Sequence, residues 1–181
     1  LKLFEKIEAN GLIEINRPSL RLYSKFTESQ GPIKAGKYDL AEGMTIREIV
    51  KLLRAGAVVN YKATFPEGWT FKQWREKLMG LPHLKQNIIG MSNLEIAEII
   101  GIKGDVEGWF FPDTYYYNFE TSDLDLLENA HKKMKEIIAL EWSKRSDEKT
   151  LNSPYDAIIL ASLVEKETGY GPDRAKIGSV F

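Results

Sequence analysis

Residues 59–65 have the sequence VNYKATF, and this stretch decides the fold. Apolar side chains alternate with polar ones through it, and a period of two predicts a β-strand. Before the strand we expect short units: turns, a brief strand within residues 33–40 and one capped helix over residues 45–55. After it, helical patterns dominate. Strands near the front and helices behind them predict an α+β fold.

Capping sequences mark where several helices begin. A Ser or Thr followed three residues later by Glu or Gln forms a capping box, which satisfies N–H groups at a helix start. This pattern begins at Thr45, Thr70 and Ser92. We also expect a long helix over residues 122–142 and a last complete helix from Ser153, with Pro154 at its first position, to about Thr168.

The change from short capped units to long helices predicts two domains. We expect residues 1–57 to form a small module and residues 58–181 to form a mainly helical domain. Within the module, one helix is expected to end near Gly11 and another to begin at Pro18. Both ends of the chain lie inside helical patterns, so we expect a fragment that is truncated at each end.

Composition excludes several classes of function. Lys and Arg total 25 against 26 Asp and Glu, and a net charge of -1 argues against a dedicated nucleic-acid binder. The chain has no cysteine, so disulfides, Cys-type zinc sites and a Cys nucleophile are excluded. Its two histidines, His83 and His131, are far apart, and we expect no metal site. No stretch reaches the roughly 18–20 apolar residues of a membrane span.

The sharpest motif for chemistry is ASLVEKETG at residues 161–169. Glu165 and Glu167 lie at the end of a strongly apolar helix, and residues two apart point to different faces. Glu167 continues the face of Leu163 and Val164, so we expect it to be partly buried. Burial and the negative end of the helix dipole both raise a carboxyl pKa, as a general acid requires.

The alternative is a structural role for the same carboxylate. Glu167 would then pair with Arg174 or Lys176 at the helix end, because structural ion pairs also perturb carboxylates. For Glu165, which follows Ala161 and Ser162 on the small and polar side, we expect a surface or helix-stabilising role.

A second motif, EGWFFPDTYYY at residues 107–117, is dense in aromatic side chains. Aromatic faces are common platforms for sugar rings, and carboxylates can accept hydrogen bonds from hydroxyl groups. The candidate binding residues are Glu107, Trp109, Phe111, Asp113 and Tyr115. If they border a sugar cleft, some rings should be exposed and close to Glu167. The alternative is a loop folded under the core, with Phe110 or Phe111 as plugs.

Two further features leave their roles open. Residues 35–53 have the size of a small binding module, but a spacer without a ligand explains them equally well. Of the two tryptophans after the turn at Gly68, we expect Trp74 in the core, and the pattern does not assign Trp69.

Taken together, these motifs resemble the endolytic murein transglycosylases, the YceG-like family. The matches occur in order and span nearly the whole chain. LASLVEKET at residues 160–168, with Arg174, Lys176, Ile177, Val180 and Phe181, is similar to the catalytic-helix signature. Residues 107–115 are similar to a second hallmark. KAGKY at residues 34–38, GMT at residues 43–45 and Glu67 with Gly68 are similar to the N-terminal, LysM-like part.

The resemblance implies an enzyme that cuts peptidoglycan glycan strands internally, without water as the acceptor. The bond lies between N-acetylmuramic acid (MurNAc) and N-acetylglucosamine (GlcNAc), and the product carries a 1,6-anhydro-MurNAc end. By resemblance Glu167 is the catalytic acid and base, and no cofactor is implied. An older label of the family, aminodeoxychorismate lyase, would imply pyridoxal phosphate, but no residue pattern marks a Schiff-base lysine or a phosphate cup.

The resemblance also implies a location. Such enzymes are tethered to the cytoplasmic membrane by a single N-terminal span, which this chain lacks, and act on its outer face, with cell-wall synthesis machinery as implied partners. The rival hypothesis is a non-catalytic wall-binding or scaffold module in which Glu167 is vestigial.

Overall fold

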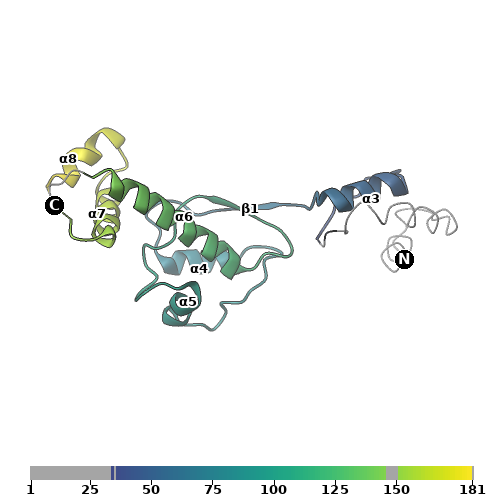
Figure 1. The fold of residues 1–181 in the computed structure, drawn as a ribbon, viewed down its shortest axis with the longest axis horizontal. Helices are drawn as coiled ribbons and strands as arrows, with labels where there is room; N and C mark the ends of the chain where they lie inside the picture. Colours follow the sequence, from purple (N-terminus) through teal and green to yellow (C-terminus); the bar gives the residue numbers. More distant parts are fainter. Residues whose placement is uncertain (1–33, 35, 146–150, 181) are drawn as a thin grey trace. The chain divides into compact units, whose positions relative to one another are not determined.

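The computed structural model describes residues 34, 36–145 and 151–180, and it divides the chain into two compact units. The first unit extends to Tyr61 and includes Asn118–Glu120, and the second comprises Lys62–Tyr117 and Thr121–Phe181. Helices and a small sheet both occur, which confirms the α+β class (Figure 1). The helices predicted near Gly11 and Pro18 lie outside the described residues.

The first unit is built on helix α3 (Ile46–Ala55), which begins with the predicted capping box between Thr45 and Glu48. Its buried residues are Ile49, Val50 and Leu53, and Tyr38, Leu40, Met44 and Ile46 pack against them. These contacts make a small core from a single helix and the segment before it. That the unit is LysM-like stays a prediction.

The strand predicted within residues 33–40 is wrong for the described part of that segment. Residues 36–40 form no regular strand. The amide of Val59 donates to the carbonyl of Lys37 at 2.8 Å, but one such bond makes no ladder. The hydroxyl of Tyr38 instead donates to the carbonyl of Lys34 at 2.7 Å and lies 3.2 Å from that of Leu53.

The strand predicted at residues 59–65 is confirmed in its central part. Strand β1 (Tyr61–Thr64) pairs with β2 (Thr114–Tyr117) in a two-stranded sheet. The predicted alternation holds, because Ala63 and Phe65 are buried while Lys62 and Thr64 are exposed. Just after β1, the ring of Phe65 stacks on Trp74 with centroids 3.8 Å apart, which confirms the core position of Trp74.

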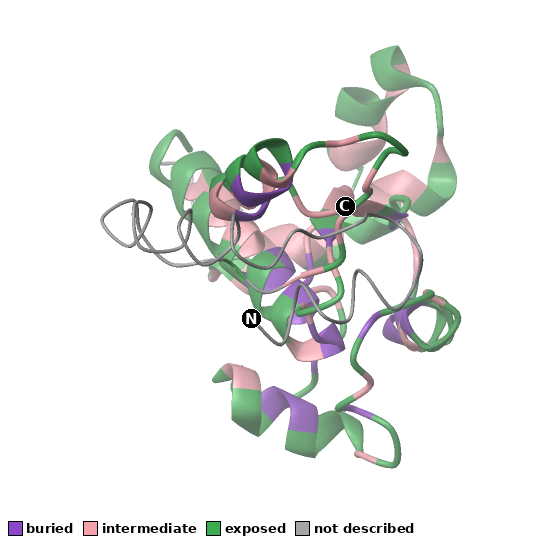
Figure 2. Cartoon of the chain, turned by 90° about the vertical axis from the view of Figure 1, so that its right-hand side faces the viewer, coloured by how far each residue is buried: buried purple, intermediate pink, exposed green. Residues whose placement is uncertain are grey.

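Helices α4 (Phe71–Met79), α5 (Asn93–Ile100) and α6 (Asp123–Ser143) contribute much of the remaining core of the second unit. Figure 2 shows the buried residues of the chain in purple. The predicted capping boxes at Thr70 and Ser92 are both present. Buried apolar side chains from the three helices are Phe71, Trp74, Leu78, Ile96, Ala97, Leu126, Leu127 and Ala130. The carboxylate of Asp123, also buried, accepts hydrogen bonds from the amides of Asn87 and Ile88 at 2.9–3.2 Å.

Helix α7 (Pro154–Glu167) lies at the carboxyl-terminal end of α6, and a 3₁₀ turn (Gly171–Asp173) leads to the short α8 (Arg174–Gly178) (Figure 1). Ser153 caps α7 and Pro154 occupies its first turn, as predicted. Although α7 has a strongly apolar sequence, none of its residues is fully buried. In the described part of the chain, no helix is both long enough and apolar enough to cross a membrane.

Candidate functional site

One face of α7 packs against two loops of the second unit. The hydroxyl of Tyr155 donates to the carbonyl of Glu107 at 3.3 Å, and its ring stacks on Trp109 with centroids 5.4 Å apart. A β-carbon at Gly108 would lie 2.9 Å from Cγ2 of Ile158. Farther along, a β-carbon at Gly68 would lie 3.6 Å from Cγ of Glu165. The aromatic stretch therefore braces the first half of this face and the Gly68 turn borders its end.

Glu165 lies on this packed face and is already paired. Its Oε2 accepts a hydrogen bond from Nη2 of Arg174 at 2.8 Å, and 28% of its side chain is exposed. The pair ties the end of α7 to α8. This geometry agrees with the helix-stabilising role expected for Glu165, although the residue is half-buried rather than on the open surface.

Glu167 lies on the opposite side of the helix. Two residues correspond to about 200° of rotation, so its side chain points away from the face that carries Glu165. Glu167 follows Ile159 and Leu163 at intervals of four, and these two side chains are 45% and 42% exposed. Glu167 is itself exposed, and within the described residues it makes no hydrogen bond or ion pair.

Both expectations for the environment of Glu167 are therefore wrong. It is not partly buried, because it lies at the end of the helix beyond an apolar stripe whose residues Ile159 and Leu163 are themselves exposed. It is also not paired with Arg174 or Lys176, since Arg174 is bound to Glu165 and Nζ of Lys176 lies 3.9 Å from Oδ1 of Asp173. What remains is an accessible carboxyl group at the end of a braced helix.

Glu107 and Asp113 are engaged in structural contacts. Both carboxylate oxygens of Glu107 accept the amide of Phe71, at 3.1 and 3.0 Å, where negative charge stabilises the start of α4. The carboxylate of Asp113 pairs with Lys133 and also accepts the amide of Thr114 at 2.6 Å. The hydrogen bond from Lys133 is the main reason that the pKa of Asp113 lies below its ordinary value.

The aromatic rings of residues 109–117 divide between core and surface. Phe110 and Tyr117 are buried, Trp109, Phe111 and Tyr115 are half-buried, and Tyr116 is exposed. The hydroxyl of Tyr115 donates to the carbonyl of Phe111 at 2.6 Å, and burial raises its pKa well above the ordinary value. Phe110 is thus a core plug, as the structural alternative predicted, whereas Phe111 is only half-buried.

Trp109 does not lie beside Glu167. It stacks on Tyr155 in the first turn of α7, and the 12 residues from Tyr155 to Glu167 span about 18 Å of helix axis. The expectation of a ring platform next to the carboxyl group therefore fails for Trp109.

The turn after β1 belongs to a different unit from the one that the sequence analysis associated it with. Glu67 and Gly68 were associated by resemblance with the N-terminal part, but both belong to the second unit, and Gly68 lies by the last turn of α7. Gly68 has a φ of 71°, a left-handed conformation that glycine adopts without strain. The sequence does indicate a turn between the strand and the capping box at Thr70. It does not indicate which helix this turn contacts.

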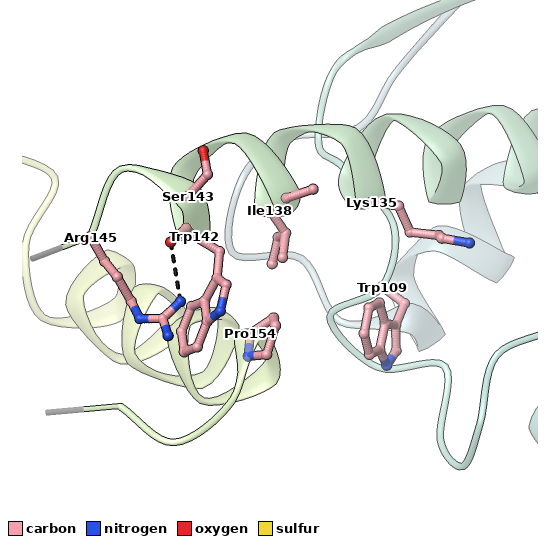
Figure 3. A pocket seen from close by; sticks show the side chains of 8 residues that line it. Trp109, Lys135, Ile138, Trp142, Ser143, Arg145 and Pro154 are labelled. Atoms are coloured by element: carbon pink, nitrogen blue, oxygen red, sulfur yellow. Dashed lines mark hydrogen bonds between the residues drawn. The ribbon is translucent and has the colours of Figure 1, made fainter. Parts of the chain in front are cut away.

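A hollow of about 550 Å³ lies between the second half of α6, the start of α7 and Trp109 (Figure 3). We call it the α6–α7 hollow. It is lined by Trp109, Lys135, Ile138, Ala139, Trp142, Ser143, Arg145 and Pro154. The guanidinium of Arg145 lies 3.8 Å above the Trp142 ring and donates to the Trp142 carbonyl at 3.2 Å. In the described part of the chain, no group of three or more acidic, His or Cys side chains is placed to hold a metal ion.

Comparison with known proteins gives consistent matches. The model of the YceG-like family matches residues 2–181. The endolytic murein transglycosylase of Bacillus subtilis (strain 168) is 26% identical over an alignment of 194 positions, which covers 97% of this chain and 53% of that protein. The endolytic murein transglycosylase of Streptococcus pneumoniae (strain R6) is 26% identical over an alignment of 189 positions, which covers 88% of this chain and 33% of that protein.

One solved structure is also similar. A YceG-like protein from Listeria monocytogenes aligns over 93% of this chain and 60% of its own, with a TM-score of 0.48 and 23% identity. The chain spans about half the length of the Bacillus relative and about a third of the Streptococcus relative.

Proposed function

Since the chain belongs to the YceG-like family, we propose that it is the core of an endolytic murein transglycosylase. The Bacillus and Streptococcus relatives carry that name. The proposed reaction cleaves the MurNAc–GlcNAc bond inside a glycan strand and leaves a 1,6-anhydro-MurNAc end.

The observation that carries the proposal is the difference between the two glutamates of α7. Glu165 is neutralised by Arg174, whereas Glu167 is exposed and has no partner among the described residues. A group that gives up a proton and then takes one back must be free to reach the substrate in both steps. Glu167 satisfies this requirement and Glu165 does not.

The proposed mechanism uses one carboxyl group twice. Protonated Glu167 donates its proton to the glycosidic oxygen as the bond to MurNAc C1 breaks, and the GlcNAc-terminated strand leaves with that proton. The C6 hydroxyl of the same MurNAc then attacks C1, and the Glu167 carboxylate accepts the hydroxyl proton. The carboxyl group is restored, no water is consumed, and the sugar closes into its 1,6-anhydro form.

The proposed reaction differs from ordinary hydrolysis because it needs only one carboxyl group. Hydrolytic glycosidases use two carboxyl groups that flank the bond. Glu165 points about 200° around the helix from Glu167 and is bound to Arg174, so it cannot supply the second group. Intramolecular attack by the C6 hydroxyl needs no second carboxylate.

The exposed stripe of Ile159 and Leu163 supports the same assignment. A general acid works best in a site from which water is excluded, because desolvation favours its protonated form. In our proposal, bound substrate covers this apolar stripe and removes water from around Glu167.

We further propose that the first unit is a LysM-like module that holds the glycan strand. In this proposal a single membrane span keeps the working protein on the outer face of the cytoplasmic membrane, near the cell-wall synthesis machinery. Fractionation of cells that produce the full-length protein, followed by protease accessibility, tests this location.

Muropeptide analysis of purified peptidoglycan tests the assignment of Glu167 in the full-length protein. Glu167→Gln keeps the shape of the side chain but cannot transfer a proton, so we expect at least the roughly 10²–10⁴-fold loss typical of acid–base groups. Glu165→Gln should lose far less, with a lower melting temperature because Arg174 loses its partner. Anhydro products from Glu167→Gln at the wild-type rate would refute the assignment.

The non-catalytic alternative predicts a different result in the same assay. A wall-binding or scaffold module would bind peptidoglycan and yield no anhydro ends with either the wild type or the variants.

A further inference from the structure

The α6–α7 hollow is distinct from the surface around Glu167. Pro154, at its edge, precedes Glu167 by 13 residues, which is about 20 Å of helix axis. Its volume of about 550 Å³ falls within the roughly 300–1,000 Å³ of small-molecule sites. Figure 3 shows Arg145 and Trp142 at one end, Lys135 and Trp109 at the other, and Ile138 between them. The mechanism proposed above does not use this hollow.

Among the described residues that line it are two cations and no carboxylate. The two cations are Lys135, on α6, and Arg145, just past the end of that helix, and Figure 3 shows them at opposite ends of the hollow. Arg145 is held in place by stacking on Trp142 and by its bond to the Trp142 carbonyl. When the flat face of a guanidinium stacks on a ring, the N–H groups along its edge stay available to donate hydrogen bonds to a carboxylate.

The second tryptophan is also held in place. Trp109 stacks on Tyr155, and its carbonyl lies 3.1 Å from Nδ1 of His131. Between the two charged ends the lining is apolar, with Ile138 and Pro154 beside the indole rings. The hollow therefore suits a ligand that has small apolar groups in its middle and anionic groups that are well separated.

We propose that the α6–α7 hollow binds the acidic peptide stem that peptidoglycan carries on MurNAc. Such a stem has methyl groups on its alanine residues and free carboxylates at separate points along its length. The choice of peptidoglycan as the source rests on the function proposed above. A phosphate polyol polymer of the wall offers anions too, but it has no methyl groups for the apolar lining, so the peptide fits this hollow better.

The test uses the 181-residue chain and the synthetic stem L-Ala-γ-D-Glu-L-Lys-D-Ala-D-Ala, acetylated at its amino terminus so that its carboxylates outnumber its ammonium group, as they do in the stem on MurNAc. The sequence has four tryptophans, so the indole N–H signals in a ¹⁵N NMR spectrum report where the peptide binds. We expect the signals of Trp109 and Trp142 to shift and those of Trp69 and Trp74 to stay. Trp→Phe variants assign the four signals.

Charge variants then test the proposed contacts. Arg145→Gln should raise the Kd about tenfold, which corresponds to about 1.4 kcal/mol, and Lys135→Gln should weaken binding in the same direction. The matched control is Lys144→Gln, because Lys144 carries the same charge at the same end of α6 but pairs with Glu141 and does not line the hollow. Amidating the carboxylates of the peptide should abolish the effect of Arg145→Gln. Unchanged melting curves confirm that the variants are folded.

Three results would overturn the proposal. They are no binding of the stem, equal binding by the Arg145→Gln and Lys144→Gln variants, and binding of poly(glycerol phosphate) in its place. Because peptide binding requires no bond cleavage, the outcome is independent of the muropeptide assay. A wild-type protein that binds the stem through Arg145 yet makes no anhydro ends would refute the proposed function and leave this inference standing.

Discussion

The contact between Gly108 and Ile158 is the most sensitive point in the bracing of α7, and Gly108→Ala tests it. Gly108 has a φ of 79°, and a β-carbon there would lie 2.9 Å from Cγ2 of Ile158. The left-handed conformation alone costs an L-residue about 1–2 kcal/mol. Forcing a methyl group into a packed contact typically costs about 1–3 kcal/mol more. We therefore expect Gly108→Ala to lower the free energy of unfolding by about 2–5 kcal/mol.

Gly104 provides a matched control in the same loop region. Its φ is 93°, but no atom lies within 4 Å of the position that a β-carbon would take. Gly104→Ala thus measures the backbone term alone, about 1–2 kcal/mol. The difference between the two variants isolates the contact with α7, and adding Ile158→Ala to Gly108→Ala should recover part of it.

Urea denaturation followed by circular dichroism measures these free energies. Equal losses for Gly108→Ala and Gly104→Ala would show that α7 does not press against this loop, and the bracing argument would fail. A double variant in which the two losses simply add would lead to the same conclusion, because no shared contact would then couple the sites.

Three other predictions concern the core of the second unit. Phe65 is 1% exposed and stacks on Trp74, so Phe65→Ala should cost about 3–5 kcal/mol in urea denaturation. Tyr116 is 64% exposed, so Tyr116→Ala should change stability by less than about 0.5 kcal/mol. Burial lowers the pKa of His131 below its ordinary 6.5, so the unfolded chain binds the proton more readily than the folded chain does. Stability should therefore fall as the pH drops below about 6.5. Melting curves recorded at several pH values should show a weaker pH dependence for His131→Gln. Asp123→Ala leaves buried amides without an acceptor and should cost about 2–5 kcal/mol by the same denaturation assay, which a loss below 1 kcal/mol would contradict.

The helix starts were predictable because they depend on neighbours in the sequence. A capping box needs only a residue and its partner three positions later, and those at Thr45, Thr70 and Ser92 are all present. The box at Ser122 was not predicted, because its partner is Asp125 rather than Glu or Gln. The alternation of β1 was predictable for the same reason, since one buried face imposes a period of two.

Contacts between distant segments were not predictable from these local patterns. The carboxylate of Glu107 caps a helix that begins 36 residues earlier, at Phe71, and no local pattern showed that this candidate binding residue makes such a contact. Arg174 lies within reach of both glutamates in sequence, and only the path of the chain through the 3₁₀ turn directs it to Glu165. The sequence gives the angle between the two glutamates but not what covers each face.

The arrangement around α7 changes the role of the aromatic stretch. Residues 107–109 contact the same face of α7 as the Gly68 turn, through Tyr155 and Ile158. Glu167 points nearly the opposite way, on the side of the exposed Ile159 and Leu163. If Glu167 is the acid, the scissile bond must approach that open side. The aromatic stretch then acts by holding α7 in position. It affects the carboxyl group of Glu167 only indirectly, because the rigid helix fixes where that group lies.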